Sequence, residues 1–308
     1  MSTRRHIHVN NSNFPHPTRS DLTGLKPEKE FFVGIDSDGC VFDTMEIKQK
    51  RCFHPLIVSH WRLQPIEKYV RECAEFVNLR SRWRGTNRYP CLYRTFELLR
   101  GRPEVIRSGA PLPDFMSFKA FLDSGVPLGH PALKTAVAET GDPELASVLK
   151  WSEAVNASIA GTARSIPPFH WAKRSLETIA KKADAIVVSQ TPTEALIREW
   201  EENGMTGLVR VIAGQELGTK AEHISMATAG RYPPERILMI GDAPGDLQAA
   251  RANKARFFPI EPGREEASWE HFHREAFDRF LAGRYTGEYE LDLIARFEAL
   301  LPENPPWE

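Results

Sequence analysis

The spacing of a few short apolar runs constrains the fold most strongly. The first run covers residues 31–35, and four later runs cover residues 185–188, 208–212, 237–240 and 256–260. Runs that are apolar on both faces are typical of strands in a parallel sheet. Helical patterns separate the late runs, and this alternation predicts an α/β fold with a doubly wound parallel sheet. Pro259 in the last run indicates an edge strand.

The long gap between the first two runs has a different character. From residue 44 to residue 171 there is no convincing strand, only helix-length patterns such as Ile66, Val70, Cys73 and Val77 on one face. Closely spaced prolines and glycines between residues 102 and 131 predict short helices there. We therefore expect an inserted all-α domain.

These patterns define the expected domain organisation. The discontinuous α/β core comprises residues 27–43 and 172–308, and the helical domain comprises residues 44–171. Two C-terminal helices are expected beyond about residue 265. Residues 1–26 lack periodicity and are expected to form a poorly ordered N-terminal arm.

Charge and hydropathy exclude several classes of protein. The 308 residues include 40 basic and 41 acidic side chains, and the net charge of −1 gives no general attraction to nucleic acid or to anionic membranes. No apolar run approaches the roughly 18 residues that span a bilayer. We expect neither a nucleic-acid partner nor a membrane partner.

The cysteines and the first residues bear on the cellular location. The four cysteines form no CxxC pair and no zinc-type spacing, which is typical of a reducing compartment. The first twenty residues lack the apolar stretch of a secretory signal, although their Arg, Ser and His content leaves an organelle-targeting role open. A cytoplasmic location is the expectation.

Chemically capable side chains follow three of the apolar runs. Asp36 and Asp38 follow the first, Ser189 follows the second, and Asp242 and Asp246 follow the fourth. In an open parallel sheet, ligands bind beyond the carboxyl ends of the strands. Crowded carboxylates repel one another and need a cation, and hard oxygen ligands favour Mg²⁺. A bound Mg²⁺ would in turn offer a docking point for a phosphate oxygen.

The order of these motifs resembles the haloacid dehalogenase-like superfamily, in its phosphohydrolase branch. The motifs are DxDG at residues 36–39, a strand that ends in Ser189, a later Lys220, and GDxxxD at residues 241–246. The insert directly after the first motif resembles that superfamily's C1-type helical cap, and there the likeness is architectural only. The resemblance implies a Rossmann-like core.

The resemblance also implies a role for each matched residue. Asp36 would be the nucleophile that forms an aspartyl-phosphate. Asp38 would protonate the leaving oxygen and later activate water, which requires a pKa well above that of a free aspartate. Mg²⁺ would be held by Asp36, Asp242, Asp246 and the backbone carbonyl of Asp38. Ser189, the backbone N–H of Gln190, and Lys220 would bind the phosphoryl group.

Each of these residues also has a purely structural alternative. The two aspartates of the first motif could form a turn, Ser189 could cap a helix, and Lys220 could be a surface lysine. Asp246 could be a first-turn acid that the helix dipole favours.

The insert carries a group of arginines with interleaved aromatic residues between residues 80 and 107. A nucleic-acid patch has these ingredients, but the neutral net charge disfavours it. The arginines could instead form a solvated helix face with structural ion pairs. One or two of them could also extend over the active site and bind an anionic substrate; the candidates are Arg80, Arg82, Arg84 and Arg88.

The expected function is Mg²⁺-dependent hydrolysis of a small phosphorylated metabolite, with the cap excluding water and setting specificity. A haloalkanoate dehalogenase would have no use for the metal cluster. A phosphonate hydrolase would need an imine-forming cap lysine, for which Lys48, Lys50 and Lys68 are candidates. The sequence also leaves open a sugar-phosphate mutase and a catalytically idle binding or regulatory module.

Overall fold

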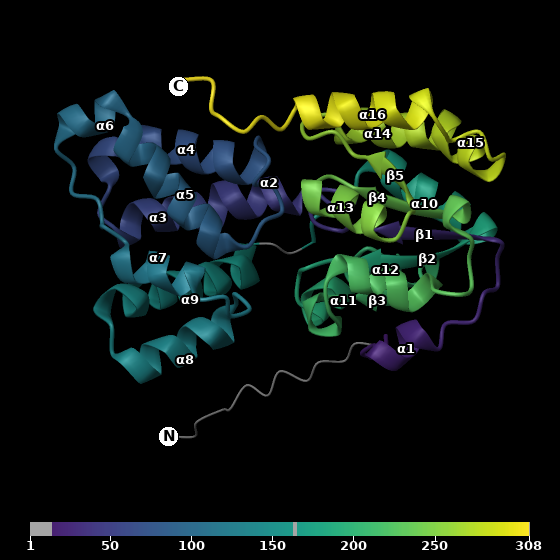
Figure 1. Cartoon of the computed structure of the whole chain (residues 1–308), viewed down its shortest axis with the longest axis horizontal. Helices are drawn as coiled ribbons and strands as arrows, with labels where there is room; N and C mark the ends of the chain where they lie inside the picture. Colours follow the sequence, from purple (N-terminus) through teal and green to yellow (C-terminus); the bar gives the residue numbers. More distant parts are fainter. Residues whose placement is uncertain (1–13, 163–164, 308) are drawn as a thin grey trace, which may run out of the picture.

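The computed structural model describes residues 14–162 and 165–307 and is organised around a five-stranded parallel sheet (Figure 1). The strand order is β3-β2-β1-β4-β5, which places the first strand in the middle. The strands are β1 (Phe31–Ile35), β2 (Ala183–Val188), β3 (Val211–Ala213), β4 (Ile237–Gly241) and β5 (Arg256–Pro259). This confirms the α/β fold, and β5 lies at the edge, where the missing N–H of Pro259 costs no ladder hydrogen bond.

Two strands begin at residues other than those expected, and β4 and β5 differ by one residue at their ends. Strand β2 begins two residues early and contains the buried Asp184, which accepts hydrogen bonds from the backbone N–H groups of Glu28 and Lys29 and from Tyr232 and Arg210. Strand β3 begins late, because Thr206–Leu208 form a 3₁₀ turn and pairing with β2 starts only at Val211. The hydrogen bonds to Asp184 explain how β2 can contain a buried charged residue that a purely apolar run did not include.

Helices cover both faces of the sheet. One face carries α10 (His170–Lys182), α11 (Thr193–Glu202), α14 (Glu265–His271) and α15 (Phe277–Leu281), around Leu176, Trp200 and Trp269. The other carries α1 (Arg19–Thr23), α12 (Lys220–Thr228) and α13 (Pro244–Ala252), around Leu22 and Ile224. A π-helical turn (Phe272–Ala276) joins α14 to α15, and α16 (Glu288–Ala299) packs beside β5, so the two expected C-terminal helical stretches are present.

Between β1 and α10, every regular element of the described residues is helical. These elements are α2 (Thr44–Lys48), a π-helical turn (Gln49–Phe53), α3 (His54–His60), a 3₁₀ turn (Gln64–Ile66), α4 (Glu67–Leu79), α5 (Arg88–Gly101), α6 (Pro103–Ser108), α7 (Met116–Asp123), α8 (His130–Thr140) and α9 (Pro143–Thr162). They enclose an apolar cluster of their own around Phe96, Phe118 and Trp151. In Figure 1 these helices lie on the left, beside the sheet and its helices. A separate core explains why the insert shows its own helical periodicity in the sequence.

Both ends of the described part of the chain pack against neighbouring elements. Residues 1–13 of the expected N-terminal arm lie outside the described residues, but residues 14–26 are folded, contrary to the expectation, because Leu22 and Leu25 are buried beside α12. At the other end, the chain beyond α16 crosses to the helical insert (Figure 1). There the ring of Trp307 lies 5.6 Å from that of Phe76 and under the guanidinium of Arg102. None of the described helices has the length and apolar character needed to cross a membrane.

Candidate active site

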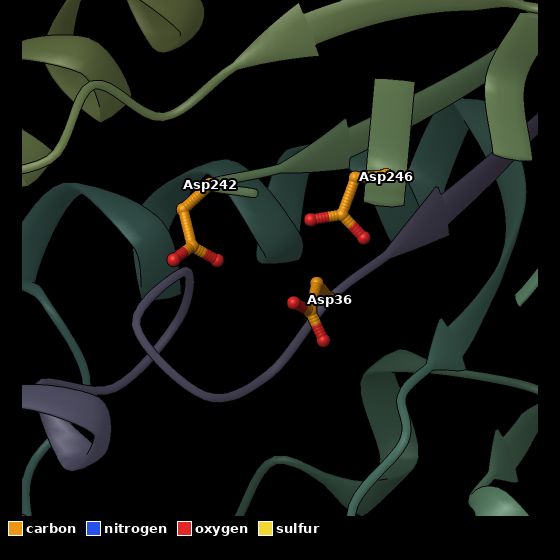
Figure 2. Close-up of side chains that lie close together, drawn as sticks. All are labelled: Asp36, Asp242 and Asp246. Atoms are coloured by element: carbon orange, nitrogen blue, oxygen red, sulfur yellow. The ribbon is translucent and has the colours of Figure 1, made fainter. Parts of the chain in front are cut away.

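Three carboxylates converge at the carboxyl-terminal edge of the sheet. Asp36 follows β1, Asp242 follows β4, and Asp246 lies in the first turn of α13. One oxygen from each lies within 4.8 Å of the others, and Figure 2 shows the three side chains turned toward a shared space. All three residues are at most 4% exposed. Burial raises the pKa of Asp36 well above its usual range, and repulsion from the other two carboxylates adds to this against the opposing charge of Lys220.

Lys220 partly neutralises this cluster. It is the first residue of α12, whose start is fixed by a capping box between Thr219 and Glu222. Its Nζ donates to Asp36 Oδ2 at 2.7 Å and to Asp246 Oδ1 at 2.6 Å. Burial alone would lower the pKa of Lys220, but the two carboxylates outweigh it, raise the pKa and keep the side chain cationic. The structure thus places Lys220 beside the proposed nucleophile.

Asp242 is held by an arginine from the helical insert. Arg84 Nη2 lies 2.6 Å from Asp242 Oδ2, its Nε donates to the same oxygen at 2.8 Å, and both residues are almost fully buried. Burial raises the pKa of Asp242 to about 6, although Arg84 opposes the rise. Among the described residues, the buried Asp242 Oδ1 has no hydrogen-bond partner. A buried carboxylate oxygen without a partner, beside two further carboxylates, fits the donor set that Mg²⁺ takes.

Two glycines permit this close packing. Gly39 adopts φ +78°, and a Cβ there would lie 2.7 Å from Asp242 Oδ2. A Cβ on Gly241 would lie 2.3 Å from Asp246 Cγ. A larger residue at either position would displace a carboxylate of the cluster, which explains why glycine follows Asp38 and precedes Asp242.

Asp38 lies differently from the expectation. Its carboxylate is not part of the three-carboxylate cluster and accepts hydrogen bonds from Thr44, Thr191 and Lys48, the last at 2.7 Å to each oxygen. Burial would raise the pKa of Asp38, but the charge of Lys48 and these hydrogen bonds together hold it below its usual range. The expected raised pKa of Asp38 is therefore wrong for this arrangement, because sequence spacing could not reveal its cationic partner.

The expected phosphate-binding residues follow β2, next to β1. The register pairs Ile35 with Val187, so Ser189 lies beside the turn that follows Asp36. The buried Ser189 Oγ accepts a hydrogen bond from the backbone N–H of Thr191. The side-chain amide of Gln190 donates a hydrogen bond to the carbonyl of Gly218. Their binding of a phosphoryl group stays a prediction. Thr191, whose hydroxyl donates to Asp38, joins the two loops.

Of the four candidate arginines, the structure brings only Arg84 to the carboxylate cluster. Arg80 pairs with Glu75 and Arg82 with Glu303, and both arginines are exposed. Arg88 donates to Ser152 and Asn156 and lies over the ring of Phe53. Three of the four thus serve the packing and surface of the insert.

Sequence reasoning missed Thr44, Thr191 and Glu199 and gave no reason to single out Lys48. Glu199, on α11, accepts a hydrogen bond from Ser37 Oγ at 3.3 Å. Burial raises the pKa of Glu199 to about 8, and repulsion from Asp38 adds to this rise while Lys48 opposes it. The missed residues lie on α2, on α11 or in the loop before α11. The usable signal was that Thr44 and Lys48 belong to the first helix after the DxDG motif.

Glu199 should make the protein less stable as the pH rises. The folded state holds the Glu199 proton more tightly than the unfolded chain does. The contribution of Glu199 to the free energy of unfolding therefore decreases as the pH rises from the ordinary pKa of a glutamate to about 8. Relative to Glu199→Gln, we expect the unfolding free energy of the wild type to fall by about 2–3 kcal/mol between pH 5 and pH 7. Urea denaturation at both pH values measures this. Glu202→Gln is the control, and parallel pH dependences for wild type and Glu199→Gln would contradict the assignment.

The strand order and the position of the acidic residues together decide the fold type. The central strand carries Asp36 at its carboxyl end, its neighbour β4 carries Asp242, and the helical insert begins directly after β1. The fold is haloacid dehalogenase-like. The resemblance expected from the sequence is thus confirmed at the level of the fold, and the C1 type of the cap stays a prediction.

Comparisons with known proteins yield structural similarity at low sequence identity. A haloacid dehalogenase-like hydrolase from Streptococcus pneumoniae matches over 87% of this chain and 98% of its own, with 15% identity and a TM-score of 0.42. CbbY from Rhodobacter sphaeroides, solved with phosphate, matches over 77% and 88%, with 15% identity and a TM-score of 0.41. A protein described as a phosphoglycolate phosphatase from Lactobacillus delbrueckii matches over 80% and 92%, with 17% identity and a TM-score of 0.46. No protein-family model and no curated protein sequence matches this chain.

Proposed function

We propose that this haloacid dehalogenase-like protein is a Mg²⁺-dependent phosphomonoester hydrolase that acts on a small phosphorylated metabolite. The observation that carries the proposal is the Asp36 carboxylate, buried in a three-carboxylate cluster and held 2.7 Å from Lys220 Nζ. A carboxylate fixed beside a cation is suited to nucleophilic attack on a phosphoryl group, whose oxygens need positive charge. Residues 44–171 would act as a cap that covers the reacting groups.

The reaction would proceed in two steps. An oxygen of Asp36 attacks phosphorus, an aspartyl-phosphate forms, and the bond to the leaving oxygen breaks as the protonated form of Asp38 donates a proton to that oxygen. Asp38 then takes a proton from a water molecule that attacks phosphorus, which releases phosphate and restores Asp36. Mg²⁺ held by Asp36, Asp242 and Asp246 would supply charge stabilisation to the phosphoryl oxygens. Lys220, Ser189 and the N–H of Gln190 would hold the same oxygens.

The proposed function predicts metal-dependent phosphate release. Purified protein should hydrolyse p-nitrophenyl phosphate in the presence of Mg²⁺, EDTA should stop the reaction, and added Mg²⁺ should restore it. The release of phosphate and the release of p-nitrophenol are both measured. Activity that survives chelation would contradict the metal's role, and isomerisation of a sugar phosphate without phosphate release would instead support a mutase.

The lysines of the insert argue against a phosphonate hydrolase, because none of the three candidates is suited to form an imine. Lys48 is the candidate nearest the site, but the charge of Asp38 outweighs the effect of burial and raises the pKa of Lys48. An ammonium group cannot attack a carbonyl to form an imine. Lys50 and Lys68 instead pair with glutamates on the surface of the insert.

A further inference from the structure

A turn that follows α4, residues 81–85, carries Arg84 from the insert to the core. The backbone N–H of Arg84 donates to the carbonyl of Ser81, and Ser81 Oγ donates to the carbonyl of Val77 in α4. Arg84 Nη1 donates to the carbonyl of Leu79 at 3.0 Å. Hydrogen bonds within the insert therefore fix the guanidinium in one orientation.

The guanidinium binds both the main chain and the side chain of Asp242. Its Nε donates to the Asp242 carbonyl at 3.0 Å and to Oδ2 at 2.8 Å, and Nη2 lies 2.6 Å from Oδ2. A Cβ on Gly39 would lie 2.7 Å from Oδ2 and 2.8 Å from Nη2, so the backbone of Gly39 closes this side of the carboxylate. Oδ1, which has no hydrogen-bond partner among the described residues, is thus the Asp242 oxygen left for a cation.

This arrangement requires the insert to be docked on the core. Gly85 adopts φ +75°, and a Cβ there would lie 2.7 Å from the Cβ of Ala243, the residue that follows Asp242. The turn and the core are therefore in close contact. If the insert moved away, Arg84 would leave with it, and Asp242 would regain the rotational freedom that a metal ligand must lose on binding. Groups that hydrogen-bond to a ligating carboxylate fix the orientation of that ligand and tune the affinity for the metal.

We propose that Arg84 is a positioning residue, which holds Asp242 with Oδ1 free for the metal and so couples docking of the insert to binding of Mg²⁺. This inference rests on the metal site of the proposed function and deepens it. Coupling of two equilibria is reciprocal, so the docked insert raises the affinity for Mg²⁺, and bound Mg²⁺ stabilises the docked insert by the same factor. An arginine that only tied the insert to the core would affect stability and leave the affinity for the metal unchanged.

Calorimetric titration of Mg²⁺ into the metal-free full-length protein tests the coupling. We expect Arg84→Met to lower the affinity for Mg²⁺ about 10- to 100-fold. Arg84→Lys, which keeps the charge but loses the planar fork, should show an intermediate loss. Gly85→Ala should also lower the affinity severalfold, because it disturbs the docked turn and leaves every charge in place. Arg80→Met is the matched control with unchanged affinity, since Arg80 pairs with Glu75 inside the insert.

The reciprocal effect is measured by hydrogen exchange at residues 81–85. Mg²⁺ should slow this exchange in the wild type and have a much smaller effect in Arg84→Met. Unchanged affinity for Mg²⁺ in a folded Arg84→Met protein would overturn the proposal, and a higher affinity would show instead that Arg84 competes with the metal. If Arg84→Met does not fold, unchanged affinity in both Arg84→Lys and Gly85→Ala would overturn it. Failure of the proposed metal site would be recognised separately, as absence of Mg²⁺ binding by the wild type.

Discussion

Asp36→Asn is expected to abolish turnover, with kcat reduced by roughly 10⁴-fold or more. The amide of asparagine can still accept the hydrogen bond that Lys220 donates to this position, so the fold should be retained. The neutral amide oxygen is a poor nucleophile, however, and no aspartyl-phosphate can form. Phosphate release under multiple turnover, together with mass spectrometry of the intact protein after rapid acid quenching, measures both effects.

Asp43→Asn provides the matched control, since Asp43 lies in the same segment but outside the three-carboxylate cluster. That variant should keep the wild-type rate within severalfold. Near-normal turnover by Asp36→Asn would show that another group attacks phosphorus, and the assignment of the nucleophile would be wrong.

Asp38→Asn is expected to slow the hydrolysis of alkyl phosphates by about 10²- to 10⁴-fold, the usual contribution of general acid–base catalysis. The rate of aspartyl-phosphate formation should decrease less with p-nitrophenyl phosphate, because nitrophenolate leaves without a proton. The second step still lacks a base for water. The phospho-enzyme should therefore accumulate with the aryl substrate, and rapid quenching after mixing should detect it.

The comparison between leaving groups tests the role of Asp38 directly. If Asp38→Asn slows alkyl and aryl phosphates equally and no phospho-enzyme accumulates, Asp38 acts only in structure, through the hydrogen bonds from Thr44, Lys48 and Thr191. A change in thermal stability measured alongside separates this outcome from simple misfolding.

Much of the site could be predicted because it depends on strand ends. Asp36 and Asp242 follow apolar runs, and parallel strands that run side by side bring their carboxyl ends to one edge. Lys220 could be selected by its motif, and the structure places it against Asp36 and Asp246. Strand β3 was misplaced along the chain because apolar character alone does not show where pairing with β2 begins.

The contacts between the insert and the core could not be predicted in the same way. Arg84 and Asp242 are separated by 158 positions in the chain, and no periodicity relates them. Four arginines in the same stretch of the insert were candidates, and the sequence does not distinguish among them. Only the packing of the insert against the core brings Arg84 to Asp242. The expectation of a raised pKa for Asp38 was wrong for the same reason. Its partner Lys48 comes from a helix whose direction cannot be predicted from the sequence.

The amino-acid sequence by itself determined the parallel sheet, the helical insert and the acidic residues at the strand ends, because hydrophobic periodicity and turn residues are local properties of the chain. Only the tertiary structure decided which cations of the insert meet which carboxylates of the core. These pairings depend on how two separately packed hydrophobic clusters meet. Burial would raise the pKa of Asp38, and it is the charge of Lys48, together with the hydrogen bonds to the carboxylate, that lowers it.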